Sequence, residues 1–274
     1  MSQSENIQIP DKLAQKFQDD GVAVIRNAFS TDWIEVLSRG LDKNIANPGR
    51  YRREYTREGG AGHFFGDYCN WSRIPEYEDF ARHSPAAEIA GTLMGSEKVN
   101  LFHEHVVVKE PGTEERTPWH HDQPYYCVDG DDNVSLWVPL DPVPKDIGVE
   151  FIKGSHKWGR WFIPTKFTGT DYDRDDTGFE PIPDIESERD NYEIASFDLD
   201  VGDCVAFHFR TVHGAPGNTA KTTRRRAISF RWTGDDARFA IRAGEMSPPF
   251  LEFENCRLDV GQVLDSELFP VIRE

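Results

Sequence analysis

The sequence predicts a mainly β protein with α support, an α+β chain in which helices precede a sandwich or jelly roll of short strands. Before Gly95, apolar residues recur at helical spacing in several stretches. After Gly95, the chain consists of short β-prone runs separated by glycine, proline and aspartate. With 274 residues, of which 38% are hydrophobic and 12% aromatic, the chain can bury a sizeable core.

The N-terminal region is expected to form a supporting layer of helices. Helices are expected over residues 11–19, from Thr31 as N-cap to about Ile45, and over 86–94. The first follows from the helical spacing of Leu13 and Phe17, and Gly21 separates it from a short strand over 22–25.

The later strands are expected where β-branched and aromatic residues cluster between turn residues. They are 99–109, 117–122, 134–140, 149–152, 203–209 and 225–233. Many short strands in succession favour a jelly roll over a parallel sheet.

We expect one domain over 1–274. It divides into mostly helical support (1–95), a jelly-roll core (96–240) with a candidate lid at 159–195, and a C-terminal tail (241–274). Within the candidate lid, residues 171–193 hold ten acidic residues and two arginines. Such a segment is either a solvated loop or a cover over a site, and the sequence leaves both open.

Charge excludes two classes of partner. Forty-eight acidic against 31 basic residues give a formal charge of −17, which repels nucleic acid and anionic membranes. The N-terminal residues lack the basic start and apolar run of a signal peptide or membrane anchor. The four cysteines are far apart and form no CxxC pair, which is typical of reduced thiols in a cytoplasmic protein.

The most informative stretch for chemistry is PWHHDQPY, residues 118–125. On a strand, side chains alternate between faces, so His120 and Asp122 would share one face and His121 would lie on the other. Two imidazoles and one carboxylate are the donor set of mononuclear non-haem Fe(II) sites, which leave positions open for a cosubstrate and O₂. A lone HxD motif is weak evidence, so a third ligand is needed.

That ligand is expected to be His213. It ends an apolar strand and is followed by Gly214 and Pro216, a strand-end position at which a side chain can face a cavity. His208 lies between two phenylalanines and fits a packed structural role better. The other histidines are interpreted as structural or exposed; they are His63, His83, His103, His105 and His156.

An arginine-rich strand follows about twelve residues later. Alternation places Arg225, Ala227, Ser229 and Arg231 on one face. An arginine buried inside a barrel needs an anionic partner, and the distal carboxylate of 2-oxoglutarate would supply it to Arg225.

These blocks together resemble the phytanoyl-CoA dioxygenase family of Fe(II)/2-oxoglutarate oxygenases. The blocks are TPWHHDQPYY (117–126), SLWVPLDPV (135–143), GVEFIKGSH (148–156), VHGAPGN (212–218) and RRAISFRWTGDD (225–236). The opening FQDDGVAVIRNAFS (17–30) is similar to the family's first helix and strand. The ordered set is more specific than any single block.

The resemblance implies a double-stranded β-helix, a cupin-like jelly roll, that binds Fe(II) and uses 2-oxoglutarate and O₂, with ascorbate as a supporting reductant. It implies iron on His120, Asp122 and His213, and the cosubstrate carboxylate on Arg225. Residues matching cosubstrate-pocket positions are Trp137, Thr117 and Ser135. Ala215 stands where some relatives place a serine that touches the cosubstrate.

The reaction that the resemblance implies is hydroxylation or a related C–H oxidation, because family halogenases replace the carboxylate ligand that Asp122 retains with a small residue. Candidates for a substrate pocket, each of which would fit a packed core equally well, are Tyr125, Tyr126, Phe64, Phe65, Trp158 and Arg231. Charge argues against a polyanionic acyl-CoA and favours a small polar or amine-bearing metabolite, or a natural product. Two alternatives stay open: a cupin-like metal enzyme without 2-oxoglutarate, and a non-catalytic ligand-binding barrel.

Overall fold

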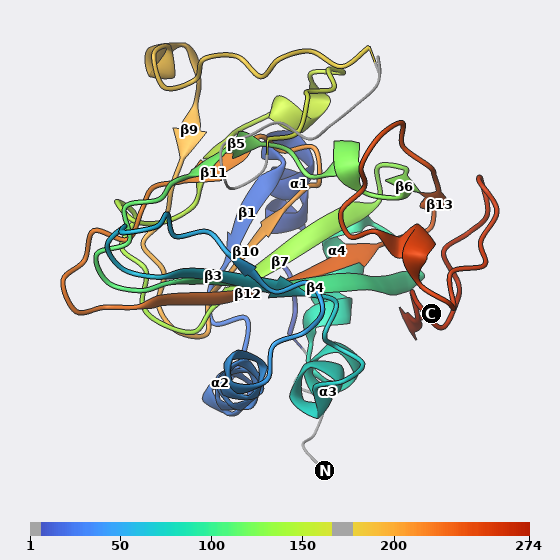
Figure 1. The fold of residues 1–274 in the computed structure, drawn as a ribbon. Helices are drawn as coiled ribbons and strands as arrows, with labels where there is room; N and C mark the ends of the chain where they lie inside the picture. Colours follow the sequence, from blue (N-terminus) through green and yellow to red (C-terminus); the bar gives the residue numbers. More distant parts are fainter. Residues whose placement is uncertain (1–6, 166–177) are drawn as a thin grey trace.

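The computed structural model describes residues 7–165 and 178–274. It contains a large twisted sheet with helices on one side and a smaller sheet on the other (Figure 1). The expected fold class, a mainly β jelly roll flanked by N-terminal helices, is confirmed.

Four α-helices occur in the described chain. They are α1 (Asp11–Asp20), α2 (Thr31–Ala46), α3 (Pro75–His83) and α4 (Ala86–Met94). Thr31 is the first helical residue of α2 and not its N-cap, which is Ser30. Gly21 ends α1 in the left-handed region, with φ of 72°, and its N–H donates to the carbonyl of Phe17. Helix α3 was not expected, although its Tyr77, Phe80 and Ala81 form a buried stripe.

The large sheet is antiparallel and has eight strands. In spatial order they are β1 (Val22–Ile25), β10 (Cys204–Phe207), β7 (Asn133–Pro139), β12 (Arg225–Thr233), β4 (Val99–Lys109), β3 (Phe64–Tyr68) and β2 (Arg53–Glu54), with β14 (Val271–Arg273) also pairing with β4. The longest strands, β4 and β12, lie side by side at the centre.

Two smaller sheets complete the fold. One has the order β5 (Thr117–His120), β11 (His213–Ala215), β8 (Glu150–Ile152) and β9 (Ile194–Ala195), and the other pairs β13 (Arg238–Phe239) with β6 (Val128–Asp129). Two expected strands are therefore shorter: the one from Thr117 stops at His120, and the one near 203–209 stops at Phe207. His213 opens β11 instead of ending the preceding strand.

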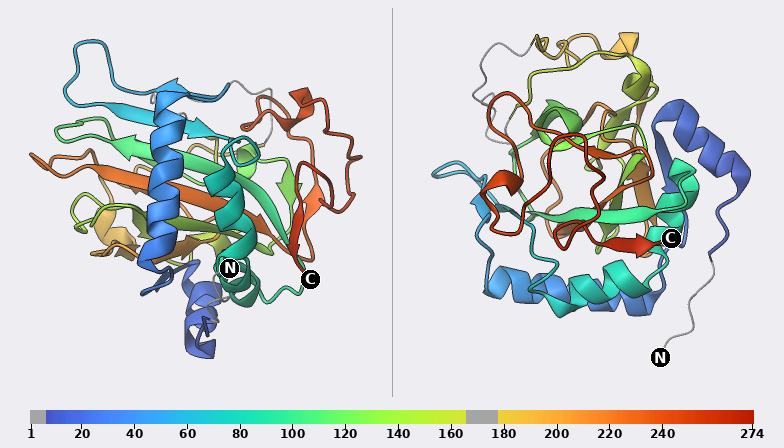
Figure 2. Two further views of the ribbon diagram at one scale, coloured as in Figure 1. Left: turned by 90° about the horizontal axis from the view of Figure 1, so that it is seen from below. Right: turned by 90° about the vertical axis from the view of Figure 1, so that its right-hand side faces the viewer.

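The helices cover the outer face of the large sheet. Helices α2 and α3 lie next to each other across that face (Figure 2). Leu37 and Leu41 of α2 share a buried cluster with Val106 of β4 and Ile228 of β12. The opposite face of the sheet is therefore left to meet the small sheet, and a cavity lies there.

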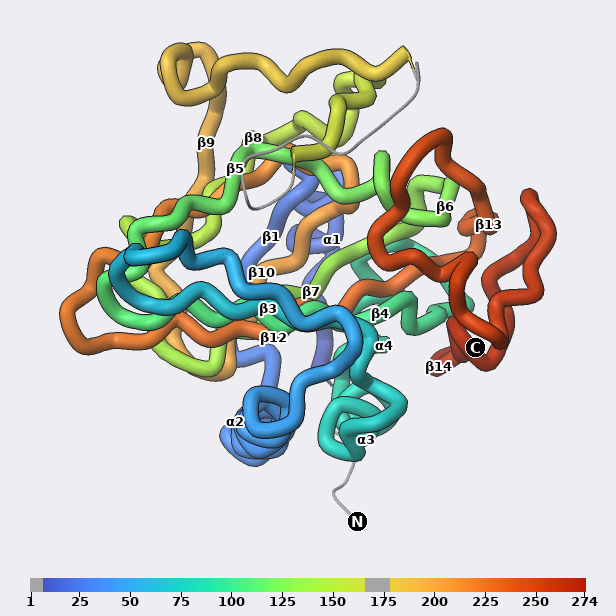
Figure 3. The backbone as a smooth tube through the Cα atoms, viewed as in Figure 1, coloured from blue at the N-terminus to red at the C-terminus, as the bar shows by residue number. Residues whose placement is uncertain are grey.

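The segment 241–274, expected to be a tail, packs against the body of the protein. It folds back beside β6 and β13 (red in Figure 3). Phe250 and Phe269 are buried together with Phe102 of β4, with ring centroids 4.9–5.3 Å apart.

The candidate lid 159–195 includes residues 166–177, which lie outside the described residues. The described part of the acidic stretch packs on the outer side of the small sheet: the Trp119 indole N–H donates to Glu186 at 2.8 Å, and Ile185 is buried against Phe162. Within the described residues, no helix is long and apolar enough to cross a membrane.

Candidate active site

A cavity of about 260 Å³ lies between the large and small sheets. Strands β3, β4, β7 and β12 contribute to it from one side, and β5 and β11 from the other. The cavity contains the three residues of the expected metal triad and Arg225.

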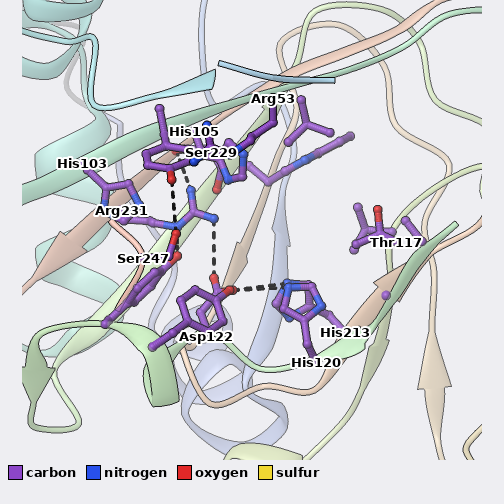
Figure 4. A pocket seen from close by; sticks show the side chains of 18 of the residues that line it. Arg53, His103, His105, Thr117, His120, Asp122, His213, Ser229, Arg231 and Ser247 are labelled. Carbon is purple, nitrogen blue, oxygen red and sulfur yellow. Dashed lines mark hydrogen bonds and ion pairs between the residues drawn. The ribbon is translucent and has the colours of Figure 1, made fainter. Parts of the chain in front are cut away.

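His120, Asp122 and His213 converge in this cavity (Figure 4). One ligand atom from each lies within 4.8 Å of the others. The Nε2 atoms of His120 and His213 are 3.5 and 3.9 Å from Asp122 Oδ1. All three side chains are buried, so the group could hold one metal ion shielded from bulk water.

Strand pairing explains the convergence. In the antiparallel ladder between β5 and β11, His213 is directly opposite His120. Asp122 lies beyond the end of β5, in the right-handed helical region, and its N–H donates to the carbonyl of Phe209. Strand alternation therefore predicted the correct grouping, but a turn and not a strand presents the carboxylate.

Each histidine is oriented by a backbone carbonyl. His120 Nδ1 donates to the carbonyl of Pro118 at 2.8 Å, and His213 Nδ1 donates to that of Thr211 at 2.9 Å. A carbonyl accepts only, so each Nδ1 carries the proton and each Nε2 presents its lone pair to the site. Burial, followed by the neighbouring His120, lowers the pKa of His213 to about 3, which keeps its imidazole neutral.

Asp122 is held from its far side by other polar groups. The Tyr125 hydroxyl donates to Asp122 Oδ1, and Arg231 Nη2 lies 3.5 Å from Asp122 Oδ2. Burial alone would raise the pKa of Asp122, but Arg231 and the histidines hold it well below its usual range. The carboxylate is therefore ionised and oriented before any metal binds.

Arg225 lies on the face of β12 that lines the cavity, as Arg231 does, and it is 2% exposed. Its guanidinium donates to the carbonyl of Ile147, and at 3.4 Å to that of Pro216. Burial lowers its pKa to about 10. Within the described residues it forms no ion pair with a carboxylate, so the buried charge suits an anionic ligand.

The cavity gathers most of the expected site residues. Besides the triad and Arg225, the expected residues that line it are Trp137, Thr117, Tyr125, Tyr126 and Arg231. Ala215 lines it as well.

Four expected site residues do not line the cavity, and two of them lie on β3. Phe65 packs in the cluster that includes residues of the helices. Tyr68 lines the cavity, and side chains alternate along a strand, so Phe65, three positions before Tyr68, points to the opposite face of β3. Phe64, at the start of the strand, packs against the Tyr55 ring and the Lys109 ammonium.

The other two are Trp158, on the outer side of the small sheet, and Ser135, within the large sheet. Trp158 packs against Phe162 and Tyr192 on the outer side of the small sheet. Ser135 is buried on β7, where its partners on the neighbouring strands are Phe207 of β10 and Arg231 of β12, and it does not line the cavity.

Sequence reasoning missed several residues that line the cavity. They include Arg53, Tyr55, Tyr68, His103, His105, Val107, Glu245, Ser247 and Pro248. His103 and His105 had been interpreted as structural or exposed. Their spacing of two on a strand was a usable signal, because β4 pairs them with Arg231 and Ser229 of the arginine-rich strand.

The cavity of this jelly roll combines two imidazoles, one carboxylate and an arginine that has no carboxylate partner in the described structure. This combination defines the class of non-haem iron, 2-oxoglutarate-dependent enzymes. The model of the phytanoyl-CoA dioxygenase (PhyH) family matches residues 17–227. The chain therefore belongs to the phytanoyl-CoA dioxygenase family, as its motifs had indicated.

Solved structures share the fold over nearly the whole chain. The α-ketoglutarate-dependent carbocyclase SnoK from nogalamycin biosynthesis has a TM-score of 0.74 and 20% identity, with 98% of each chain covered. The epimerase SnoN, in complex with Fe³⁺, α-ketoglutarate and nogalamycin RO, has a TM-score of 0.72 and 22% identity, covering 96% of this chain and 98% of SnoN. EctD from S. alaskensis, with 2-oxoglutarate and 5-hydroxyectoine, has a TM-score of 0.66 and 19% identity, covering 89% and 87%. No curated protein matches the sequence.

Proposed function

We propose that this protein is an Fe(II)/2-oxoglutarate-dependent dioxygenase that hydroxylates an unactivated C–H bond of a small polar metabolite or natural product. The observation that carries the proposal is the presence in one cavity of three ligand atoms within 4.8 Å of one another and of a buried arginine. The donor set leaves room for a bidentate cosubstrate and O₂.

Each residue has a role in this proposal. His120 and His213 hold iron through Nε2, and Asp122 holds it through its carboxylate. Arg225 binds the distal carboxylate of 2-oxoglutarate, and Trp137 and Thr117 line the cosubstrate end of the cavity. When bound, iron and 2-oxoglutarate supply the oxidising chemistry, with succinate and CO₂ as coproducts. The chain's own contribution is to fix these groups, exclude water and place the C–H bond.

The same residues support one further outcome at the substrate carbon. SnoK is named a carbocyclase and SnoN an epimerase, and both align with almost this entire chain. Ring closure or stereoinversion of a natural-product scaffold is therefore our second candidate reaction. Product mass separates the possibilities, because only hydroxylation adds an oxygen atom to the substrate.

We also propose that residues 1–274 act as one domain in the cytoplasm. The cavity takes lining residues from Arg53 to Pro248, so the site needs most of the chain. Within the described residues all four cysteines are free thiols, which suits a reducing compartment.

An anaerobic titration tests the proposal. Fe(II) followed by 2-oxoglutarate should produce a visible metal-to-ligand charge-transfer band in the wild-type protein and none in His120→Ala. Succinate formation is then followed across a metabolite library. A wild-type protein that binds Fe(II) but gives no such band would favour a cupin-like enzyme without 2-oxoglutarate, and one that binds no Fe(II) would favour a ligand-binding barrel.

A further inference from the structure

We propose that the wall of the cavity formed by β3, β4 and the middle of β12 is a substrate subsite for neutral, oxygen-rich groups, namely hydroxyls and carbonyls. Its residues are Tyr68, His103, His105 and Ser229. The inference rests on the proposed function, because it concerns the substrate of that same site. It narrows the substrate class, since it disfavours the amine-bearing compounds that the sequence left open.

Strand register assembles this subsite. Tyr68 of β3 is directly opposite His105 of β4, His105 is opposite Ser229 of β12, and Ser229 is opposite Trp137 of β7. All four residues line the cavity, so they form one row across its floor. His103 lies in the next row, opposite Arg231 (Figure 4). The row runs from Trp137, which we have proposed to line the cosubstrate end, to Tyr68.

Two polar atoms of the subsite lack a partner among the described residues. They are Nδ1 of His103 and Oγ of Ser229, whose residues are 2% and 3% exposed. Buried polar atoms are normally hydrogen-bonded, and an exception that lines a cavity points to a ligand. An imidazole nitrogen and a hydroxyl complement a substrate hydroxyl or carbonyl.

Charge argues against an ammonium group here. Among the described residues that line the cavity, three arginines face two carboxylates; these are Arg53, Arg225, Arg231, Asp122 and Glu245. Fe(II) and the 2-oxoglutarate dianion would cancel each other, which leaves the excess positive charge in place. A cation would lose its hydration without gaining a compensating anion.

The imidazoles of His103 and His105 are neutral mainly because they are buried. Burial, followed by the charge of Arg231, lowers the pKa of His103 well below its usual range and that of His105 to about 3. A neutral imidazole can both donate and accept, which suits an uncharged polar group.

Benzyl alcohol and benzylamine test the subsite, because they have the same shape and differ in one charge. Their dissociation constants are measured by saturation-transfer NMR on the full chain loaded with Zn(II) and 2-oxoglutarate, which cannot react. Benzyl alcohol should bind about tenfold more tightly than benzylamine, a difference expected for one uncompensated charge at a desolvated site.

Variants then locate the contact. Ser229→Ala and His103→Phe should each weaken benzyl alcohol roughly two- to tenfold, the effect of one hydrogen bond. His103 packs among the rings of Phe102, Tyr126 and Phe250, so phenylalanine keeps its packing. Thr233→Val is the matched control: Thr233 is also on β12, and its buried hydroxyl has no partner in the described structure, yet it does not line the cavity. Thr233→Val should leave the dissociation constants of benzyl alcohol and benzylamine unchanged.

The inference is overturned if benzylamine binds as tightly as benzyl alcohol, or if Ser229→Ala leaves benzyl alcohol unchanged. It is also overturned if Ser229→Ala weakens 2-oxoglutarate instead, because Ser229 would then belong to the cosubstrate end. Should His103→Phe fail to fold, Ser229→Ala decides. Failure of the proposed function looks different: the wild-type protein would give no 2-oxoglutarate charge-transfer band, while the alcohol–amine preference could still be measured on the metal-free chain.

Discussion

Arg231 Nη2 lies 3.5 Å from Asp122 Oδ2, with side chains that are only 7% and 1% exposed. The pair joins β12 of the large sheet to the turn after β5 of the small sheet (Figure 4). Arg231 Nε also donates to the Tyr126 hydroxyl. The proposed metal ligand is therefore anchored to the opposite sheet, and Arg231 acts as a positioning residue for it.

Replacing Arg231 by leucine should destabilise the metal-free protein by about 3–5 kcal/mol, because it leaves the Asp122 carboxylate buried without its partner. A bound divalent cation would pair that carboxylate again, so Co(II) should recover more stability in the variant than in the wild type. Urea unfolding with and without Co(II) measures both effects.

Arg231→Lys and Arg224→Leu are the controls for this experiment. Lysine retains the charge and should recover part of the loss. Arg224 forms a half-exposed pair with Glu110, so its loss should cost at most about 1 kcal/mol. If Co(II) stabilises Arg231→Leu and the wild type equally, the carboxylate does not depend on Arg231 for its charge balance.

The metal triad was predictable because two kinds of sequence signal agree there. The HxD spacing groups His120 with Asp122, and the Gly214 and Pro216 that follow His213 mark a strand end at which a side chain can face a cavity. The conformation of Asp122 was not predictable, because it depends on a long-range hydrogen bond from its N–H to the Phe209 carbonyl. Local alternation cannot report such a contact.

The metal-free protein should lose stability as the pH falls from about 6.5 toward 3. Burial, followed by Arg231, lowers the folded-state pKa of His105 to about 3, below the unfolded value of about 6.5. Between these pH values the unfolded state binds a proton that the folded state does not. The contribution of His105 to the free energy of unfolding is therefore fully present above about pH 6.5, and it declines by up to about 1.4 kcal/mol per pH unit below that. His121 and His213, each with a pKa lowered to about 3, act in the same direction.

Urea unfolding at pH 7.5 and 5.5 isolates the share of His105. The difference in unfolding free energy between the two pH values should be about 1.4 kcal/mol smaller in His105→Phe than in the wild type. His83, whose side chain is 66% exposed beside Asp79, provides the control variant His83→Phe, which should keep the wild-type difference. Equal differences in all three proteins would show that His105 does not stay neutral in the fold.

Arg225→Ala should weaken 2-oxoglutarate binding by about 1.5–3 kcal/mol, roughly ten- to hundredfold, since a hydrogen bond between charged groups is lost. Arg226→Ala is a close control, because the neighbouring side chain is paired with Asp141 at 2.8 Å and does not line the cavity. The charge-transfer band titrated with 2-oxoglutarate reports both. Similar constants for the two variants would place the cosubstrate carboxylate elsewhere.

The substrate side of the cavity was hidden from the sequence for two reasons. Residues 241–274 carry no clear periodicity, yet long-range packing on Phe102 brings Glu245 and Ser247 to the cavity. Aromatic residues such as Phe65 and Trp158 suit a pocket and a core equally well, and only the register of their strand or the packing of their loop decides between the two.

His121 provides the sharpest comparison with its neighbour His120. Its Nε2 accepts the N–H of Phe162 at 3.0 Å, and it does not line the cavity. His121→Ala should therefore keep the Fe(II) affinity within about threefold, while stability falls by about 1–3 kcal/mol because the buried Phe162 N–H loses its acceptor. His120→Ala should instead abolish tight Fe(II) binding, because two protein ligands remain. Anaerobic Fe(II) titration and urea unfolding of both variants separate the roles, and a large loss of Fe(II) affinity in His121→Ala would mean that the metal is held from the other face of the motif.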